Sequence, residues 1–435
     1  MKTLIISHMP FLSYDAMGKT FCSLFSCFEK QELCQLYIYP SIPNVDKCES
    51  LYRITDKDVL KGLFKRKLGR VIENSEIDKA GSNLYENAND EKIYRTPKNK
   101  KPLRMLMRDA MWKISHWYSK NLVEWIKNEK PTVIFIAPGT AKFIYDVALK
   151  ISKKFKLPIV GYICDDYYFV KDGDSFLKKR QIRLLQKKTE KLMARTSKII
   201  SISEEIRRNY EGKFKVPCLT LMTGSSFSVD EACKYYREEK RDDSALVYLG
   251  NVRCDRYKSL VNIGKALDRI NKKHNTNYKL KIYTSEKNEE ILNCLKSVKS
   301  ITLSGYVSGE EFLQTLCSAE VLVHTESFDE GMIDLVKNSI STKIADSLAS
   351  GRKFLAYGPK GIASIDYLND NGLAFVATKE SELEEVVYKS LTEDGRAIID
   401  RARKFAKQNH DSQKNSLILY NEMQSISGEN ESTSG

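Results

Sequence analysis

Short segments that are apolar at every position alternate along this 435-residue chain with segments of helical periodicity. A strand that is apolar on both sides is typical of a parallel sheet with helices on both faces. The alternation lapses after residue 216 and begins again at Ala245–Leu249. The sequence therefore predicts an α/β protein with two doubly wound parallel sheets. The predicted strands are Lys2–Ser7, Leu36–Tyr39, Thr132–Ala137, Ile159–Cys164, Lys198–Ser203, Ala245–Leu249, Lys279–Tyr283, Ile301–Leu303, Val321–His324, Phe354–Tyr357 and Ala374–Val376.

The length of the chain is enough for two domains, each with a core of its own. We expect the first domain to comprise residues 1–222 and the second to comprise residues 223–427, because the periodicity lapses between them. Residues from about 50 to about 130 fit the alternation poorly and are predicted to form a basic helical insertion in the first domain. Residues 428–435 are small and polar, which predicts a disordered tail.

Three features of the composition indicate a cytoplasmic protein. No apolar run approaches the length of a membrane-spanning helix. The first apolar stretch, Thr3–Ile6, is too short for a signal peptide. The 10 cysteines form no CxxC pair, which favours reduced thiols over a disulfide framework or a zinc site. We therefore expect no bound metal ion.

The formal net charge of +14 is concentrated in two predicted helical segments, Lys98–Lys120 and Lys178–Lys198. Such basic amphipathic segments fit an anionic membrane surface, with Trp112, Trp117 and Trp125 as aromatic contacts. They also fit nucleic acid, or a solvated helix face without a partner. Because no nucleic-acid-binding motif accompanies them, we expect no nucleic acid partner.

Ligands of open parallel sheets bind beyond the carboxyl ends of the strands, so the residues that follow each strand are candidates for the site. In the first half these are Gly18, which follows the first strand, and the pair Asp165 and Asp166. Gly18-Lys19-Thr20 lacks the first glycine of a P-loop, because Ser13 stands there. We expect Gly18 to allow close approach of a ligand. Asp165 and Asp166 are candidates for catalysis, and a helix cap is the structural alternative.

The second half holds the larger group of candidates. Ser341 and Thr342 open a predicted helix with free amides, Lys343 adds a positive charge, and Asp346 lies one turn further on. This combination suits a nucleoside diphosphate, with cations and amides for phosphate and a carboxylate for ribose; an ordinary capped helix is the alternative. The other candidates follow two strands and are Gly250, Asn251, Arg253, Arg256, Lys258 and Glu326.

The second half also resembles the nucleotide-sugar-binding domain of the retaining "group 1" glycosyltransferases, which have the GT-B fold and build bacterial capsules and other polysaccharides. The first half resembles capsule-type members of the same group. The segments that carry the resemblance are Tyr248–Val261, Leu303–Val307, Ala319–His324 and Asp346–Gly351 in the second half, and Ser7–Pro10, Met17–Thr20 and Ile163–Asp166 in the first.

The resemblance implies two Rossmann-like domains that face each other across a cleft. It implies a nucleotide-sugar donor, a lipid-linked or oligosaccharide acceptor, and no metal or other cofactor. Lys258 would bind the donor diphosphate together with Arg253 or Arg256, and Asp346 would bind the ribose. Asp165 or Asp166 would face the acceptor hydroxyl or the donor sugar.

One departure from the group concerns the first glutamate of its usual acidic motif, because Asn338 stands at that position. Glu326 is the candidate that would replace it. The missing glutamate keeps open a non-catalytic glycosyltransferase-like subunit. A protein that binds nucleic acid or an anionic surface is the other alternative.

Overall fold

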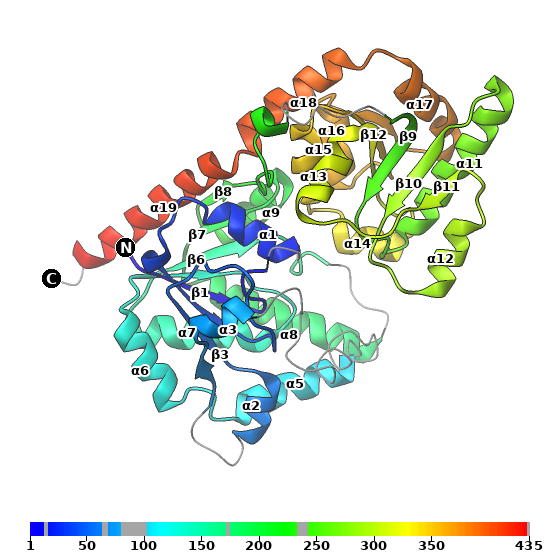
Figure 1. The fold of residues 1–435 in the computed structure, drawn as a ribbon. Helices are drawn as coiled ribbons and strands as arrows, with labels where there is room; N and C mark the ends of the chain where they lie inside the picture. Colours follow the sequence, from blue (N-terminus) through cyan, green and yellow to red (C-terminus); the bar gives the residue numbers. More distant parts are fainter. Residues whose placement is uncertain (13–15, 63–67, 80–101, 171–174, 233–241, 433–435) are drawn as a thin grey trace. The chain divides into compact units, whose positions relative to one another are not determined.

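The computed structural model describes residues 1–12, 16–62, 68–79, 102–170, 175–232 and 242–432. These residues form two compact units, each built around a sheet (Figure 1). The first unit consists of Met1–Leu221 together with Gln413–Gly435, and the second is Met222–Ser412. The predicted α/β class with two sheets is confirmed.

The sheet of the first unit has the strand order β4-β3-β2-β1-β5-β6-β7-β8, and its neighbouring strands are parallel except for β3 and β4. The strands are β1 (Thr3–Ser7), β2 (Leu33–Tyr37), β3 (Ser50–Arg53), β4 (Arg70–Val71), β5 (Val133–Ile136), β6 (Ile159–Ile163), β7 (Thr196–Ser201) and β8 (Cys218–Thr220). The described α-helices of this unit are α1 (Ala16–Leu24), α2 (Asp56–Lys61), α3 (Asn74–Lys79), α5 (Pro102–Ile114), α6 (Lys120–Glu129), α7 (Lys142–Phe155), α8 (Phe176–Met193), α9 (Glu204–Phe214) and α19 (Ser412–Ser432).

The sheet of the second unit is parallel throughout, with the order β11-β10-β9-β12-β13-β14. Its strands are β9 (Asp242–Leu249), β10 (Lys279–Tyr283), β11 (Ile301–Leu303), β12 (Ala319–Thr325), β13 (Lys353–Tyr357) and β14 (Phe375–Ala377). Its described α-helices are α11 (Arg256–His274), α12 (Glu289–Lys296), α13 (Gly309–Ser318), α14 (Glu330–Val336), α15 (Lys343–Ala349), α16 (Ala363–Asp370), α17 (Glu380–Thr392) and α18 (Arg396–Asn409).

Strand β5 shows why the strands are apolar at every position. Ile134 and Ile136 point into one buried cluster of the first unit, whereas Val133 and Phe135 point into the cluster on the opposite face. Strand β12 does the same in the second unit, with Leu322 in one cluster and Val323 in the other. Because helices cover both faces, each side chain of such a strand loses contact with water.

The domain boundaries predicted at the end of the chain are wrong. Residues 413–427 belong to the first unit, because Leu419 and Met423 of α19 are fully buried in one of its two clusters. The predicted tail is helical as far as Ser432, and residues 433–435 lie outside the described residues. The boundary near residue 222 agrees with the division after Leu221.

The segment predicted as an insertion is partly a continuation of the first sheet. Strand β3 pairs in parallel with β2, and β4 pairs with β3, so both extend the sheet on one side. Helix α5 confirms the helical pattern in the basic segment, whose first residues, 98–101, lie outside the described part of the chain.

Candidate functional site

The candidate site of the second unit lies at the carboxyl ends of β9 and β12, which are neighbours in the sheet. The loop after β9 leads into α11, which begins at Arg256. Glu326 directly follows β12, and α15 begins at Lys343. Parallel strands place all these chain segments at one edge of the sheet, as the strand-end rule predicts.

Arg256 and Glu326 form a two-pronged ion pair at this edge. Arg256 Nε donates to Glu326 Oε2 at 3.0 Å and Nη2 donates to Oε1 at 3.1 Å. The Glu326 side chain is 2% exposed and that of Arg256 is 15% exposed. Burial alone would raise the pKa of Glu326, but His324 and Arg256 outweigh burial and lower it. Glu326 is therefore ionised, and its main role here is to hold the guanidinium in place.

His324, the next-to-last residue of β12, is a site residue that the sequence analysis did not select. Its Nε2 lies 3.2 Å from Glu326 Oε1. Burial lowers the pKa of His324 and the nearby Arg256 and Lys343 lower it further, which outweighs the attraction of Glu326. The imidazole is thus neutral at pH 7, and Arg256 supplies the charge that balances Glu326. A signal for His324 was present in the sequence: it is the last residue of the predicted strand Val321–His324, and ligands bind near the carboxyl ends of such strands.

Lys343 reaches the same edge from α15. Its Nζ donates to the Tyr248 hydroxyl at 3.2 Å and lies 4.7 Å from the centre of the Tyr248 ring. Gly250 adopts φ +139°, and a Cβ atom there would lie 1.9 Å from Lys343 Nζ. A Cβ atom at residue 250 would therefore displace the lysine, and the backbone conformation itself favours glycine.

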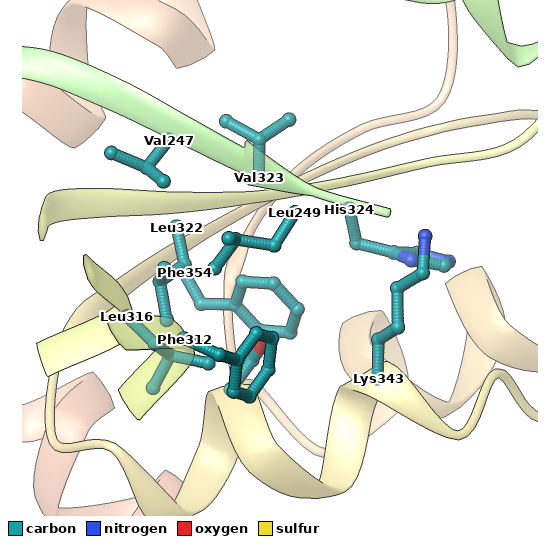
Figure 2. A pocket seen from close by; sticks show the side chains of 10 residues that line it. Val247, Leu249, Phe312, Leu316, Leu322, Val323, His324, Lys343 and Phe354 are labelled. Atoms are coloured by element: carbon teal, nitrogen blue, oxygen red, sulfur yellow. The ribbon is translucent and has the colours of Figure 1, made fainter. Parts of the chain in front are cut away.

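A largely apolar pocket adjoins Lys343, and its cavity volume of about 20 Å³ is room for a water-sized group. Figure 2 shows Lys343 and His324 at one end of the pocket, with the rings of Phe312 and Phe354 toward the other. The remaining lining residues are Val247, Leu249, Leu316, Leu322, Val323 and Ser347. Apolar side chains beside a cation are the surroundings that a ligand joining a flat ring to an anion needs, but the pocket would have to widen to admit a ring.

Asp346 does not stand open to a ligand as predicted. Its Oδ1 accepts hydrogen bonds from Ser225 Oγ at 3.0 Å, from the Ser226 amide at 2.8 Å and from Ser226 Oγ at 2.9 Å. The side chain is 5% exposed. Asp346 therefore anchors the loop at 225–226 to α15.

The predicted helix cap at the start of α15 is also wrong. Thr342 already has helical dihedral angles, and its side chain makes no capping hydrogen bond. The Ser341 amide donates to Ser364 Oγ at 2.9 Å. Gly351 follows α15 in a left-handed conformation with φ +74°, which ends the helix.

The other basic candidates lie further out. Lys258 Nζ pairs with Asp255 Oδ2 at 2.7 Å, and Arg253 Nε lies 3.5 Å from Glu286 Oε2; both cations are exposed. Asn251 Oδ1 accepts a long hydrogen bond of 3.4 Å from Arg256. Of the two arginines, Arg256 is the one that the structure holds at the strand ends. Contact of Lys258 or Arg253 with a diphosphate stays a prediction.

Asp166, which follows β6 in the first unit, stabilises its own loop. Its Oδ1 accepts from the amides of Tyr168 at 3.1 Å and Phe169 at 3.0 Å, and from the Tyr210 hydroxyl at 3.3 Å. Asp165 Oδ2 accepts from the Tyr167 hydroxyl at 2.9 Å. Asp166 thus stabilises a turn and caps no helix, since the next described helix, α8, begins at Phe176 with Ser175 as its cap. A catalytic role for either carboxylate stays a prediction.

Gly18 lies within α1, and the approach of a ligand to it stays a prediction. A Cβ atom at this position would lie 1.9 Å from the carbonyl oxygen of Leu12. The close approach that requires glycine is therefore made by the backbone of the chain itself. Residues 13–15, which include the position of the missing P-loop glycine, lie outside the described residues.

The buried histidines make stability depend on pH. Burial and the neighbouring Arg108 lower the pKa of His8 to about 3, and burial also lowers the pKa of His324 and His410. The unfolded chain, with histidine pKa values near 6.5, therefore takes up protons first as the pH falls. We expect His8 to reduce the free energy of unfolding by about 2 kcal/mol between pH 7.5 and pH 5, and His324 and His410 to act in the same direction.

Urea titrations at several pH values measure this slope. His8→Gln should make the decline between pH 7.5 and pH 5 shallower, whatever it does to stability at pH 7.5. An unchanged slope in this variant would contradict the assignment of His8.

Among the described residues, no group of three or more His, Cys, Asp and Glu side chains is placed to hold a metal ion. No described helix is both long and apolar enough to cross a bilayer. The prediction that the protein needs no metal or other cofactor stays a prediction.

A comparison with models of known protein families finds no match, and neither does a comparison with curated proteins. Solved structures do match. HepE of Anabaena in complex with UDP has a TM-score of 0.61 and 10% identity, and the match covers 98% of this chain and 100% of that one. Trehalose-6-phosphate synthase of Burkholderia multivorans has a TM-score of 0.61 and 8% identity. Sucrose-phosphate synthase of Thermosynechococcus elongatus has a TM-score of 0.61 and 11% identity. Each of these two matches covers 98% of this chain and 99% of the other chain. The likeness shows that the chain has the GT-B fold, with two Rossmann-like units.

Proposed function

We propose that this protein is a glycosyltransferase that moves a sugar from a nucleotide-sugar donor to a saccharide acceptor. The observation that carries the proposal is the pair of cations, Arg256 and Lys343, held at the carboxyl ends of β9 and β12 beside an apolar pocket. This arrangement offers an apolar wall for a nucleobase and positive charge for a diphosphate. The full-length likeness to HepE, which was solved with UDP, supports the same proposal.

The proposed chemistry follows from charge. As the bond between the sugar and the diphosphate breaks, negative charge grows on the leaving phosphate oxygen. Lys343 and Arg256 would stabilise this charge from fixed positions, as preorganised cations do, and the exposed Lys258 or Arg253 would join them on binding of the diphosphate. The bond from the acceptor oxygen to the anomeric carbon forms, and the hydroxyl proton passes to a diphosphate oxygen or to a carboxylate. Asp165 or Asp166 is our candidate for that carboxylate.

The finer points of the proposal come from the resemblance to the "group 1" enzymes. They are retention of configuration, catalysis without a metal ion, and a lipid-linked or oligosaccharide acceptor that is used for a cell-surface polysaccharide. A protein with such an acceptor would work at the cytoplasmic face of the membrane. We do not propose that Glu326 contacts the sugar, because Arg256 donates to both of its oxygens.

Thermal unfolding with a panel of nucleoside diphosphates and sugar nucleotides tests the proposal. A ligand present at about 100 times its dissociation constant should add about 2.7 kcal/mol to the free energy of unfolding. For a unit of this size the melting temperature should rise by about 5–10 °C. The panel is run with and without magnesium. The corresponding nucleoside monophosphates are measured as well, so that the contribution of the second phosphate to the rise in melting temperature is known.

A rise with one diphosphate, without magnesium, would identify the base of the donor. Incubation with the corresponding sugar nucleotides and release of the diphosphate then tests for transfer. If no diphosphate raises the melting temperature of the folded protein, the proposal fails, and a subunit without catalytic activity becomes the better description. Binding without release on any acceptor would also favour such a subunit.

A further inference from the structure

Helix α5 carries a stripe of apolar side chains that face solvent. Leu103 is 56% exposed, Met107 is 64% exposed and Ile114 is 66% exposed. Their spacings of four and seven residues place them on one side of the helix. Arg104 and Lys113 are exposed beside them. Large aliphatic groups exposed at this spacing and flanked by cations are typical of a helix that lies on a surface.

The first turns of α8 extend this surface. Phe176 is 78% exposed, and the next residue, Leu177, is partly exposed as well. Gln181 Nε2 lies 2.9 Å from Met105 Sδ, so α8 contacts α5 near the beginning of both helices. The exposed basic residues of α8 are Lys178, Lys179, Arg180, Arg183, Lys187 and Lys191. We call the exposed side chains of α5 and α8 together the α5–α8 face.

The opposite side of α5 is fixed to the first unit, so the stripe belongs to a firmly held helix. Arg108 Nε donates to Asp56 Oδ1 at 3.0 Å, and Arg108 Nη2 lies 3.1 Å from His8 Nε2. Asp109 pairs with the buried Lys142 at 2.5 Å. Asp109 is the only acidic residue of α5, and it pairs with Lys142 on the side that faces the first unit. The side of α5 that faces solvent therefore carries basic and apolar residues.

The tryptophans have a different role from the predicted one. Trp112, Trp117 and Trp125 are all buried in the core of the first unit. The ring of Trp112 stacks on Phe143 with 4.1 Å between the centroids, and its Nε1 donates to Asp56 Oδ1 at 2.7 Å. The aromatic contacts expected from the sequence are thus structural, and the exposed apolar groups are other residues.

We propose that the α5–α8 face docks on a lipid bilayer that contains anionic lipid. Met107, Ile114 and Phe176 would enter the headgroup region, while the lysines and arginines would lie over the lipid phosphates. A nucleic acid would satisfy the cations but would leave Leu103, Met107 and Ile114 in water. The docking itself is independent of the proposed function, whereas its use for presenting a lipid-linked acceptor rests on that function.

Sedimentation with large unilamellar vesicles tests the docking. We expect the protein to bind vesicles with about 30% phosphatidylglycerol at least about 10-fold more tightly than purely zwitterionic vesicles, because each basic residue near an anionic surface contributes. Met107→Glu with Ile114→Glu should reduce binding to the anionic vesicles by about 10-fold or more. Both residues are exposed, so the variant should keep its fold, which a thermal melt checks.

The matched control is Tyr306→Glu with Leu417→Glu, which adds the same charge at exposed apolar residues elsewhere. This control should bind like the unaltered protein. Equal binding to both kinds of vesicle, or equal loss in both double variants, would overturn the proposal, as would tighter binding to single-stranded RNA than to anionic vesicles. Stabilisation by nucleoside diphosphates is measured without vesicles, so failure of the docking and failure of the proposed function are told apart.

Discussion

Replacing Arg256 by methionine should abolish most sugar transfer and also destabilise the second unit. Glu326 is 2% exposed, so the variant would leave a buried carboxylate without its main partner. Such a loss costs about 3–5 kcal/mol of the free energy of unfolding. Loss of a preorganised cation at the leaving phosphate should lower kcat/KM by about 10²- to 10³-fold. Urea denaturation and initial rates of diphosphate release measure the two effects.

A double variant separates stability from catalysis. Arg256→Met with Glu326→Leu replaces both members of the buried pair by apolar groups, which is often close to neutral for stability. We expect this variant to regain most of the lost stability and to remain as slow as the single variant. Recovery of activity along with stability would show that Arg256 serves the fold alone, and would remove it from the proposed mechanism.

Replacing Lys343 by methionine should weaken the response to nucleoside diphosphates and lower kcat/KM by about 10²- to 10³-fold. Little stability should be lost, because Met keeps most of the packing of the long side chain. Lys337→Met is the control, since this lysine, just after α14, pairs with Asp334 instead.

Gly250→Ala offers an independent check, because its Cβ atom would lie 1.9 Å from Lys343 Nζ and displace the lysine. We expect its effect on kcat/KM to be large in the unaltered protein and much smaller in the Lys343→Met variant. Equal effects in both backgrounds would contradict the role of Gly250 as the space for Lys343.

The two sheets were predictable because their strands are apolar on both sides, a pattern that local sequence displays. Strand β3 escaped prediction because Ser50 and Arg53 interrupt the apolar pattern, and α2 and α3 follow in a polar region. The assignment of α19 to the first unit depends on where Leu419 and Met423 pack. The local periodicity of a helix does not indicate which distant part of the chain it packs against.

The same contrast holds for the candidate site. The rule of strand ends brought Arg256, Glu326 and Lys343 to one edge of a sheet, as the structure has them. That rule does not predict which partners each side chain contacts. Asp346 accepts hydrogen bonds from residues about 120 positions earlier, a contact that only the folded chain creates. Residue types at strand ends thus indicate where a site lies, whereas roles depend on contacts between distant segments.

Helix α19 has a consequence for the order in which the protein acquires its structure during synthesis. The second unit is one continuous stretch, Met222–Ser412, and all of it leaves the ribosome before α19 does. The first unit holds the earlier residues, yet the cluster on one side of its sheet stays incomplete until Leu419 and Met423 arrive. We therefore expect the second unit to be completed first, while the nascent first unit exposes an apolar surface that chaperones recognise.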